Sequence, residues 1–315
     1  MHPRVKISIL VVLSVLFVTC FLFLNLGSNW GYALPRRGMK ILAIVITGAA
    51  IGFSTTIFQT ITNNRILTPS ILGLDSLYML IQTVIIFALG SMHMAVANKQ
   101  FNFLLSVGLM VAFTGLLFRL LFKGDGRNLY LLLLIGIVFG TFFQSISTFL
   151  QVLIDPNEFL IAQDRMFASF NNVNTDILYL GIGGIVCCGV YFVRFYKFLD
   201  VLALGRDQAI NLGVKYDQVI RQLLIIVSIL TAISTALVGP IMFLGLLVVN
   251  VSHEFLKTHL HKYLIWGSVW IAILALVGGQ LIVERVFTFS TPLSVIINFI
   301  GGIYFIYLLL KERQS

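Results

Sequence analysis

Charged residues are scarce in this sequence. Of its 315 residues only 10% are Asp, Glu, Lys or Arg, whereas 59% are hydrophobic. A typical soluble domain has about 25% charged and roughly 45–50% apolar residues. So few charges cannot cover a soluble surface, which excludes most classes of soluble enzyme. The net charge of +9 then indicates orientation in a membrane better than it indicates binding to nucleic acid.

Cysteine is also rare, and common catalytic motifs are absent. Cys20, Cys187 and Cys188 are odd in number and lie in apolar runs, so a disulfide framework is not expected. The chain has no Gly-x-x-x-x-Gly-Lys-Ser/Thr loop for ATP phosphates and no Gly-x-Ser-x-Gly elbow. His253 has no second histidine four residues later, the spacing that a zinc-binding helix needs. The sequence therefore predicts neither an enzyme nor a metal protein.

Long apolar runs take up most of the chain. A helix that crosses a bilayer uses about 20 residues, so this length has room for roughly ten. Runs bounded by charged residues, Gly and Pro predict an all-α integral membrane protein in which residues 1–315 form one transmembrane domain. The ten predicted spans are residues 7–28, 41–61, 72–92, 101–122, 129–152, 176–196, 219–239, 242–256, 263–283 and 293–310.

The basic residues are distributed unevenly between the predicted connections. With the N-terminus inside, the inner segments hold 15 of the 21 Lys and Arg residues and the outer segments hold six. Cytoplasmic loops of membrane proteins carry an excess of Lys and Arg. Both termini are therefore predicted to be cytoplasmic.

Acidic residues are nearly missing from the predicted spans. Asp75, Glu254 and Glu284 lie near predicted helix ends, and the middles of the spans have no charged residue. Transporters driven by ions or protons usually need ionisable groups inside the membrane. We therefore expect any transport by this chain to draw its energy from another protein.

The longest inner connection, residues 198–217, joins the predicted sixth and seventh spans. Its pattern predicts two short helices at residues 199–204 and 207–212, separated by Gly205 and closed by Gly213, because Gly is favoured just past a helix end. Both helices have an apolar face. Such a pair either lies on lipid headgroups or docks onto a cytoplasmic protein, and the pattern alone favours neither.

Five motifs in order resemble those of one transporter family. Residues 203–214 (Ala-Leu-Gly-Arg-Asp-Gln-Ala-Ile-Asn-Leu-Gly-Val) resemble the cytoplasmic coupling loop of FecCD-type permeases, which belong to ABC importers for iron–siderophores, haem and vitamin B12. Residues 34–36, 62–73, 238–246 and 291–302 resemble further motifs of that family, and the resemblance covers about residues 34–312. Departures at residues 72–76, 248–250 and 290–294 are similar to the branch that serves catecholate or petrobactin-type siderophores.

The resemblance implies a fold and a set of partners. The expected fold is that of the vitamin B12 importer permease, a type II ABC importer with ten helices per subunit. The expected partners are a second permease subunit, a dimer of cytoplasmic ABC ATPases and an extracytoplasmic siderophore-binding protein. ATP and Mg²⁺ would bind to the ATPases, and this chain would itself bind no cofactor or metal. A bacterial cell membrane is the implied location.

The resemblance also implies roles for individual residues. The ATPase-coupling residues would be Leu204, Gly205, Arg206, Asp207, Ala209, Ile210, Leu212 and Gly213. Arg36, Arg37 and Arg285 would dock the binding protein, with anchoring to lipid headgroups as the alternative. The residues expected to line the translocation path are Gln59, Gln144, Ser145, Ser147 and Asn298. Hydrogen bonding between packed helices is the alternative role for this last set.

Other functions remain open at this point. An ion-coupled transporter or channel would need charges within the spans, and an intramembrane enzyme would need a catalytic pair there. The cargo could instead be vitamin B12 or haem, since the binding protein largely sets which chelate is carried. The second permease could be an identical chain or a paralogue.

Overall fold

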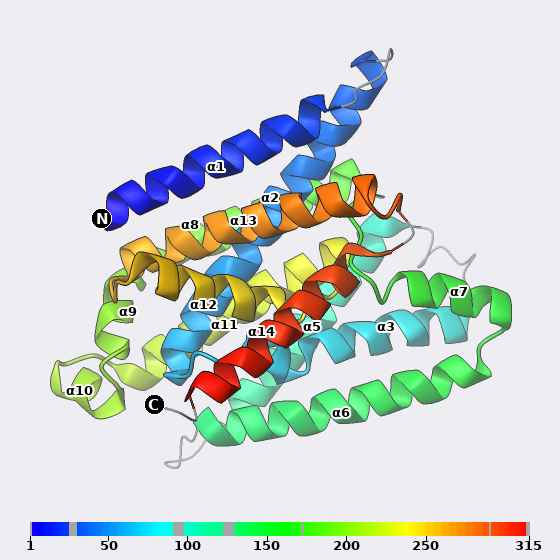
Figure 1. Cartoon of the computed structure of the whole chain (residues 1–315). Coiled ribbons are helices and arrows are strands. Elements are labelled where there is room, and N and C mark those ends of the chain that lie inside the picture. Colours follow the sequence, from blue (N-terminus) through cyan, green and yellow to red (C-terminus); the bar gives the residue numbers. More distant parts are fainter. Residues whose placement is uncertain are drawn as a thin grey trace.

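The computed structural model describes residues 2–24, 30–90, 98–121, 129–171, 173–289 and 291–312, and the regular elements in these ranges are helices (Figure 1). This confirms the predicted all-α fold. The elements in chain order are α1 (Pro3–Phe23), α2 (Trp30–Thr62), η1 (Pro69–Leu72), α3 (Leu74–Leu89), α5 (Lys99–Leu121), α6 (Leu129–Leu153), α7 (Pro156–Asp164), α8 (Thr175–Phe192), α9 (Tyr196–Leu202), α10 (Arg206–Asn211), α11 (Tyr216–Val238), α12 (Leu244–Leu256), α13 (His261–Arg285) and α14 (Leu293–Glu312).

In the part of the chain that the structure describes, an apolar helix lies in each of the ten predicted runs. Eight of those in the described ranges are long and apolar enough to cross a membrane, whereas α3 and α12 are shorter. At 1.5 Å per residue, the 16 residues of α3 and the 13 of α12 reach only about 24 and 20 Å, less than a hydrocarbon core of about 30 Å. Each is preceded by non-α-helical chain, η1 before α3 and residues 239–243 before α12.

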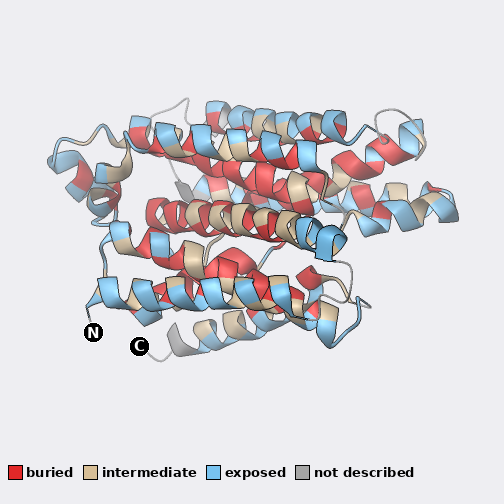
Figure 2. Cartoon of the chain, turned by 90° about the horizontal axis from the view of Figure 1, so that it is seen from above, coloured by how far each residue is buried: buried red, intermediate tan, exposed pale blue. Residues whose placement is uncertain are grey.

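The centre of the bundle is formed by α2, α11 and α13. In α2 and α11, 72% of the most apolar stretch is buried, against 17% in α1 and 22% in α14. Figure 2 shows the same distribution, with buried positions on the inner helices and exposed ones on the helices around them. The exposed apolar faces of α1, α6 and α14 are therefore available to lipid or to another subunit.

Small residues allow the central helices to approach closely, as is usual in membranes. A Cβ atom on Gly52 of α2 would lie 2.9 Å from the carbonyl oxygen of Ser268 on α13. One turn further along α2, the Thr56 and Ser268 hydroxyls are 2.7 Å apart. The contact between α2 and α13 thus depends on a residue without a side chain and on a hydroxyl pair beside it.

Glycine also forms the joint between η1 and α3. Gly73 has a φ of +79°, a conformation that other residues rarely adopt. Its Cβ would lie 2.9 Å from the Cα of Gly140 on α6. The joint is therefore held against α6 at a distance that only glycines permit.

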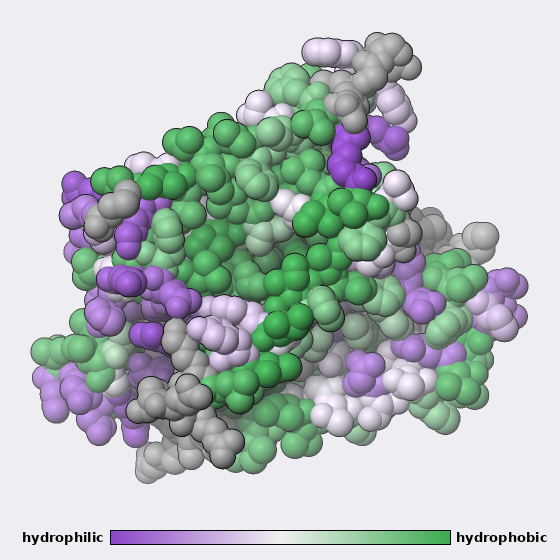
Figure 3. All heavy atoms as spheres, in the orientation of Figure 1, coloured by the Kyte–Doolittle hydropathy of each residue, from purple (hydrophilic) through white to green (hydrophobic). Residues whose placement is uncertain are grey.

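The two ends of the bundle differ in what they present. In Figure 1 the start of α1 and the end of α14 lie at the same end as α9 and α10. The Lys6 Nζ donates to the Phe255 carbonyl at 2.6 Å, and the Arg4 side chain reaches the Tyr263 hydroxyl at 3.4 Å, which joins α1 to α12 and α13 at this end. The starts of α2 and α8 lie at the opposite end. Figure 3 shows hydrophilic residues gathered towards these two ends and an apolar band between them.

The predicted start of the second helix was wrong. Residues 41–61 were expected, but α2 begins at Trp30 and includes Pro35. The proline lies in the second turn of α2, so the hydrogen bond that an N–H there would donate to the Gly31 carbonyl is missing. With 33 residues, α2 is about 50 Å long and extends well beyond the bilayer core, so Arg36 and Arg37 project from a helix and not from a loop.

Candidate functional site

The predicted pair of short helices is present, at the end of the bundle where α1 starts (Figure 1). They are α9 and α10, and α9 begins at Tyr196, three residues earlier than expected. Gly205 between them and Gly213 after them have φ values of +98° and +82°, which is the reason glycine is needed at both turns. The Val214 N–H donates to the Ala209 carbonyl at 3.0 Å and closes the second turn.

The two helices present an apolar tip to the surroundings. Leu204, Ile210 and Leu212 are 57%, 46% and 63% exposed, and α10 projects from the end of the bundle (Figure 1). Arg206 and Asp207 are exposed beside them in the first turn of α10. Ala209 is fully buried, unlike the other predicted coupling residues. It therefore packs α10 against the rest of the protein and does not face the surroundings.

A hydrogen-bonded chain that the sequence did not predict joins α9 to two central helices. Asp200 of α9 accepts from the His261 backbone N–H at 3.0 Å, and its Oδ1 lies 2.7 Å from the His261 Nδ1. The His261 Nε2 lies 2.8 Å from the hydroxyl of Thr60 on α2. His261 is 4% exposed and is the first residue of α13, so the Asp200 carboxylate also meets the positive end of that helix.

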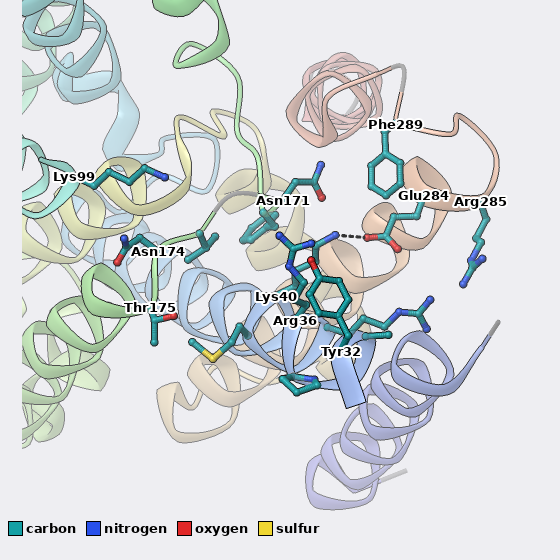
Figure 4. A pocket seen from close by; sticks show the side chains of 16 residues that line it. Tyr32, Arg36, Lys40, Lys99, Asn171, Asn174, Thr175, Glu284, Arg285 and Phe289 are labelled. Atoms are coloured by element: carbon teal, nitrogen blue, oxygen red, sulfur yellow. Dashed lines mark hydrogen bonds and ion pairs between the residues drawn. The ribbon is translucent and has the colours of Figure 1, made fainter. Parts of the chain in front are cut away.

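The opposite end of the bundle, where α2 and α8 begin, contains a large basic pocket (Figure 4). Its volume is about 840 Å³, and it is surrounded by the starts of α2, α5 and α8, the end of α13, and residues 170–171 and 173–174. Glu284 is the acidic residue of its lining. The basic residues of its lining are Arg36, Arg37, Lys40, Lys99 and Arg285.

Several of these cations have partners within the chain. The Arg37 Nη1 donates to the carbonyls of Phe21, Leu22 and Leu24, at 3.1, 3.0 and 2.8 Å. The Arg285 Nη2 donates to the Leu24 carbonyl at 2.7 Å. Both arginines therefore cap the C-terminal end of α1, where backbone carbonyls have no partner of their own.

The remaining cations are arranged differently. Lys40 forms an ion pair with Glu284 at 3.0 Å, drawn as the dashed line in Figure 4. The Arg36 guanidinium lies over the ring of Tyr32, with 5.0 Å to the ring centroid. Lys99 is exposed at the start of α5. Of the three predicted docking residues, Arg37 and Arg285 thus bind the end of α1, whereas Arg36 stacks on Tyr32.

The predicted path residues fall into two groups. Gln144 and Ser145 are exposed on α6, and Asn298 is half-buried on α14, where its Oδ1 accepts from the Phe243 N–H at 3.4 Å. Gln59 and Ser147 are buried within this chain. The Gln59 amide donates to the Arg65 carbonyl at 2.7 Å, and the Ser147 hydroxyl lies 2.9 Å from that of Thr83.

Asp75 lies near the end of a span, as predicted, but it is buried, which the sequence did not predict. It is the second residue of α3, but only 3% of it is exposed. The cause is tertiary, because η1 and α11 cover this end of α3. The Thr235 hydroxyl of α11 donates to the Asp75 Oδ1 at 3.0 Å, and the Oδ2 has no hydrogen-bond partner.

Comparison with known proteins identifies the family. Residues 4–311 match the FecCD transport family. The chain belongs to this family. Within the described ranges no group of three or more His, Cys, Asp or Glu residues could hold a metal ion.

The relatives of this FecCD-family chain are transport proteins. It is 65% identical over 315 residues to the petrobactin import system permease protein YclO of Bacillus subtilis, covering 100% of both chains. It is 38% identical over 278 residues to the petrobactin import system permease protein FatC of Bacillus anthracis, covering 88% of this chain and 78% of the relative. These similarities and the apolar helices make it a multi-pass protein of the bacterial cytoplasmic membrane.

The fold matches that of a solved transporter. A putative metal-chelate type ABC transporter, solved in an inward-facing conformation, superposes with a TM-score of 0.85 and 20% sequence identity, covering 98% of this chain and 100% of that one. At this identity the match shows the fold, and the fold is the one expected from the sequence motifs.

Proposed function

We propose that this chain is the membrane-spanning permease subunit of an ABC importer that carries a ferric siderophore of the petrobactin type into the cytoplasm. The observation that carries the proposal is the 65% identity to YclO over the whole of both chains. The fold of a metal-chelate type ABC transporter supports it. The chain itself is not catalytic and holds no cofactor, because ATP and Mg²⁺ bind to the separate ATPase subunits.

The α9–α10 pair is the proposed contact with the ATPase. Leu204, Ile210 and Leu212 form an exposed apolar tip, which suits a groove in a protein, and Arg206 and Asp207 set its register. When the two ATPase subunits close around bound nucleotide, they would move this tip. The two permease subunits would then rotate relative to each other as rigid bodies. An apolar cluster exposed to water is unfavourable, so its exposure beside charged residues is typical of a surface that binds a protein partner.

The chain of hydrogen bonds from Asp200 to Thr60 is the proposed route by which this movement reaches the core. It connects α9 directly to α13 through His261 and to α2 through Thr60. Since α2 and α13 pack closely at Gly52, a displacement of α9 is passed to the central helices as a unit. His261 and Asp200 act here as positioning residues.

The basic pocket at the outer end is the proposed docking surface for the binding protein. Among the described residues that line it, five are basic and one is acidic, so acidic side chains on the delivery protein would be attracted and oriented. Arg36 and Lys99 would meet the partner, whereas Arg37 and Arg285 keep the end of α1 in place. The alternative is that these cations bind lipid headgroups. A measurement of binding-protein affinity distinguishes the two roles.

A second permease subunit, identical or paralogous, would cover the exposed faces of α6 and α14. Gln144, Ser145 and Asn298 are the described path candidates not enclosed within this chain, and the proposed path runs past them between the two subunits. Gln59 and Ser147 are buried in this conformation. They would line the path only in a conformation of the assembled transporter in which the helices that cover them have moved apart.

The test is uptake by the complete transporter in proteoliposomes. The chain is reconstituted with its second permease, ATPase and binding protein, and ⁵⁵Fe–petrobactin, a ⁵⁵Fe–hydroxamate, haem and vitamin B12 are offered separately. We expect uptake of ferric petrobactin that stops when the ATPase carries a hydrolysis-blocking substitution. Uptake that survives this substitution and follows an ion gradient would refute the proposal in favour of secondary transport.

A further inference from the structure

A small polar cavity lies beside the buried carboxylate of Asp75. Its volume is about 20 Å³, and it lies between α2, η1, α3, α11 and the connection to α12. A cavity of about 10–15 Å³ on this measure already holds one water molecule. There is thus room for about one water or one small ion next to an oxygen, the Asp75 Oδ2, that has no hydrogen-bond partner.

The walls of the cavity offer acceptors more than donors. Each hydroxyl has one proton, and three of those in the wall donate theirs to a backbone carbonyl of their own helix. Ser54 donates to Ile51 at 3.2 Å, Thr231 to Val227 at 2.9 Å, and Ser234 to Thr231 at 2.9 Å. These three hydroxyl oxygens therefore have only lone pairs left for a ligand in the cavity.

Further oxygens complete the surroundings of the carboxylate. The Ser70 hydroxyl lies beside Asp75, and Thr55 also lines the cavity. Among the described residues of the lining there is no Lys, Arg or His. The described residues that line the cavity thus supply no positive charge to Asp75, although a buried carboxylate is stable only when it is paired or neutralised.

We propose that this cavity binds one small monovalent cation of the size of Na⁺, held by the Asp75 carboxylate together with hydroxyl oxygens of η1 and α11. A hard cation prefers oxygen ligands, and carboxylate and hydroxyl oxygens are what the cavity presents. The competing arrangement is a protonated Asp75 carboxyl group beside one water molecule, and the infrared measurement below distinguishes it from a bound ion. Met242, which is 45% exposed, forms one wall and is the side from which an ion can enter.

Binding of this ion would hold four elements together. Asp75 belongs to α3, Ser70 to η1 and Ser234 to α11, while Gly239 and Ile241 line the cavity from the connection to α12. An ion between them stabilises the folded state by mass action, in proportion to the logarithm of its concentration above the dissociation constant. This ion site does not depend on whether the transported cargo is a siderophore.

The experiment uses the full chain in lipid nanodiscs and follows thermal unfolding by tryptophan fluorescence. NaCl is exchanged for choline chloride at constant ionic strength, with KCl as a size control. We expect a saturable rise in melting temperature with Na⁺, a smaller one with K⁺, and loss of the rise in Asp75→Asn. Asp176→Asn is the matched control, because Asp176 is also an acid in the first turn of a helix but is exposed, and it should keep the rise.

Two further results decide the assignment. If Asp75→Asn does not fold, Ser234→Ala should raise the Na⁺ concentration at half-effect by about tenfold, the loss of one neutral ligand. Equal melting temperatures of the wild type in NaCl and choline chloride would overturn the proposal. An infrared band of a protonated carboxyl group that persists in NaCl and disappears in Asp75→Asn would also overturn it, since the carboxyl would then hold a proton and not an ion.

Discussion

The His261→Ala substitution tests whether α9 is fastened to the core by hydrogen bonds. The imidazole makes two contacts, 2.7 Å to the Asp200 carboxylate and 2.8 Å to the Thr60 hydroxyl. Thr60 keeps its bond to the Thr56 carbonyl, and Asp200, whose side chain is 48% exposed, can be solvated. Neither partner is therefore stranded, and the loss is the net value of the two bonds.

The magnitude follows from the kind of bond. A neutral hydrogen bond contributes about 0.5–1.5 kcal/mol and one to a charged group about 1.5–3 kcal/mol, so His261→Ala should weaken the attachment of α9 by about 2–4.5 kcal/mol. That corresponds to roughly a 30- to 1,600-fold increase in the detached population of α9. The His261 backbone bond to Asp200 survives the substitution, so α9 and α13 should still form.

The assay compares transport with hydrolysis in the reconstituted importer. We expect His261→Ala to hydrolyse ATP but to import fewer chelate molecules per ATP, and the amides of residues 196–202 to exchange hydrogen faster. His259→Ala is the control, because His259 is exposed in the same connection. An unchanged ratio of transport to hydrolysis, together with unchanged exchange in α9, would refute the role of this chain of hydrogen bonds.

Three other changes have expected outcomes. Leu212→Asp should leave the chain in the membrane but abolish stable binding of the ATPase, measured by co-purification, and full binding would contradict the apolar contact. Arg36→Glu should weaken binding-protein docking, most strongly at low salt, whereas equal affinity at all salt concentrations would assign Arg36 to lipid. Gly52→Ala should destabilise the α2–α13 contact by about 1–3 kcal/mol, seen as a lower melting temperature. Gly108→Ala, where no atom lies within 4 Å of the added Cβ, should not.

Local sequence signals predicted the parts of this protein that depend on neighbouring residues. The length of each apolar run gives the helices, because a segment in lipid must satisfy its backbone bonds within itself. Gly205 and Gly213 predicted the ends of the two short helices, because their positive φ values are a property of single residues. The start of α2 was missed, because Pro35 looks the same in a loop and in the second turn of a helix.

The sequence by itself thus determined an all-α membrane protein of the FecCD family, with its helices and its short inner pair. Only the tertiary structure decided that Arg37 and Arg285 cap α1, that His261 links Asp200 to Thr60, and that Asp75 lies buried beside a cavity. The physical reason is distance along the chain. Such contacts join residues far apart in sequence. The partner of a polar residue can be identified only when the packing of the helices is known.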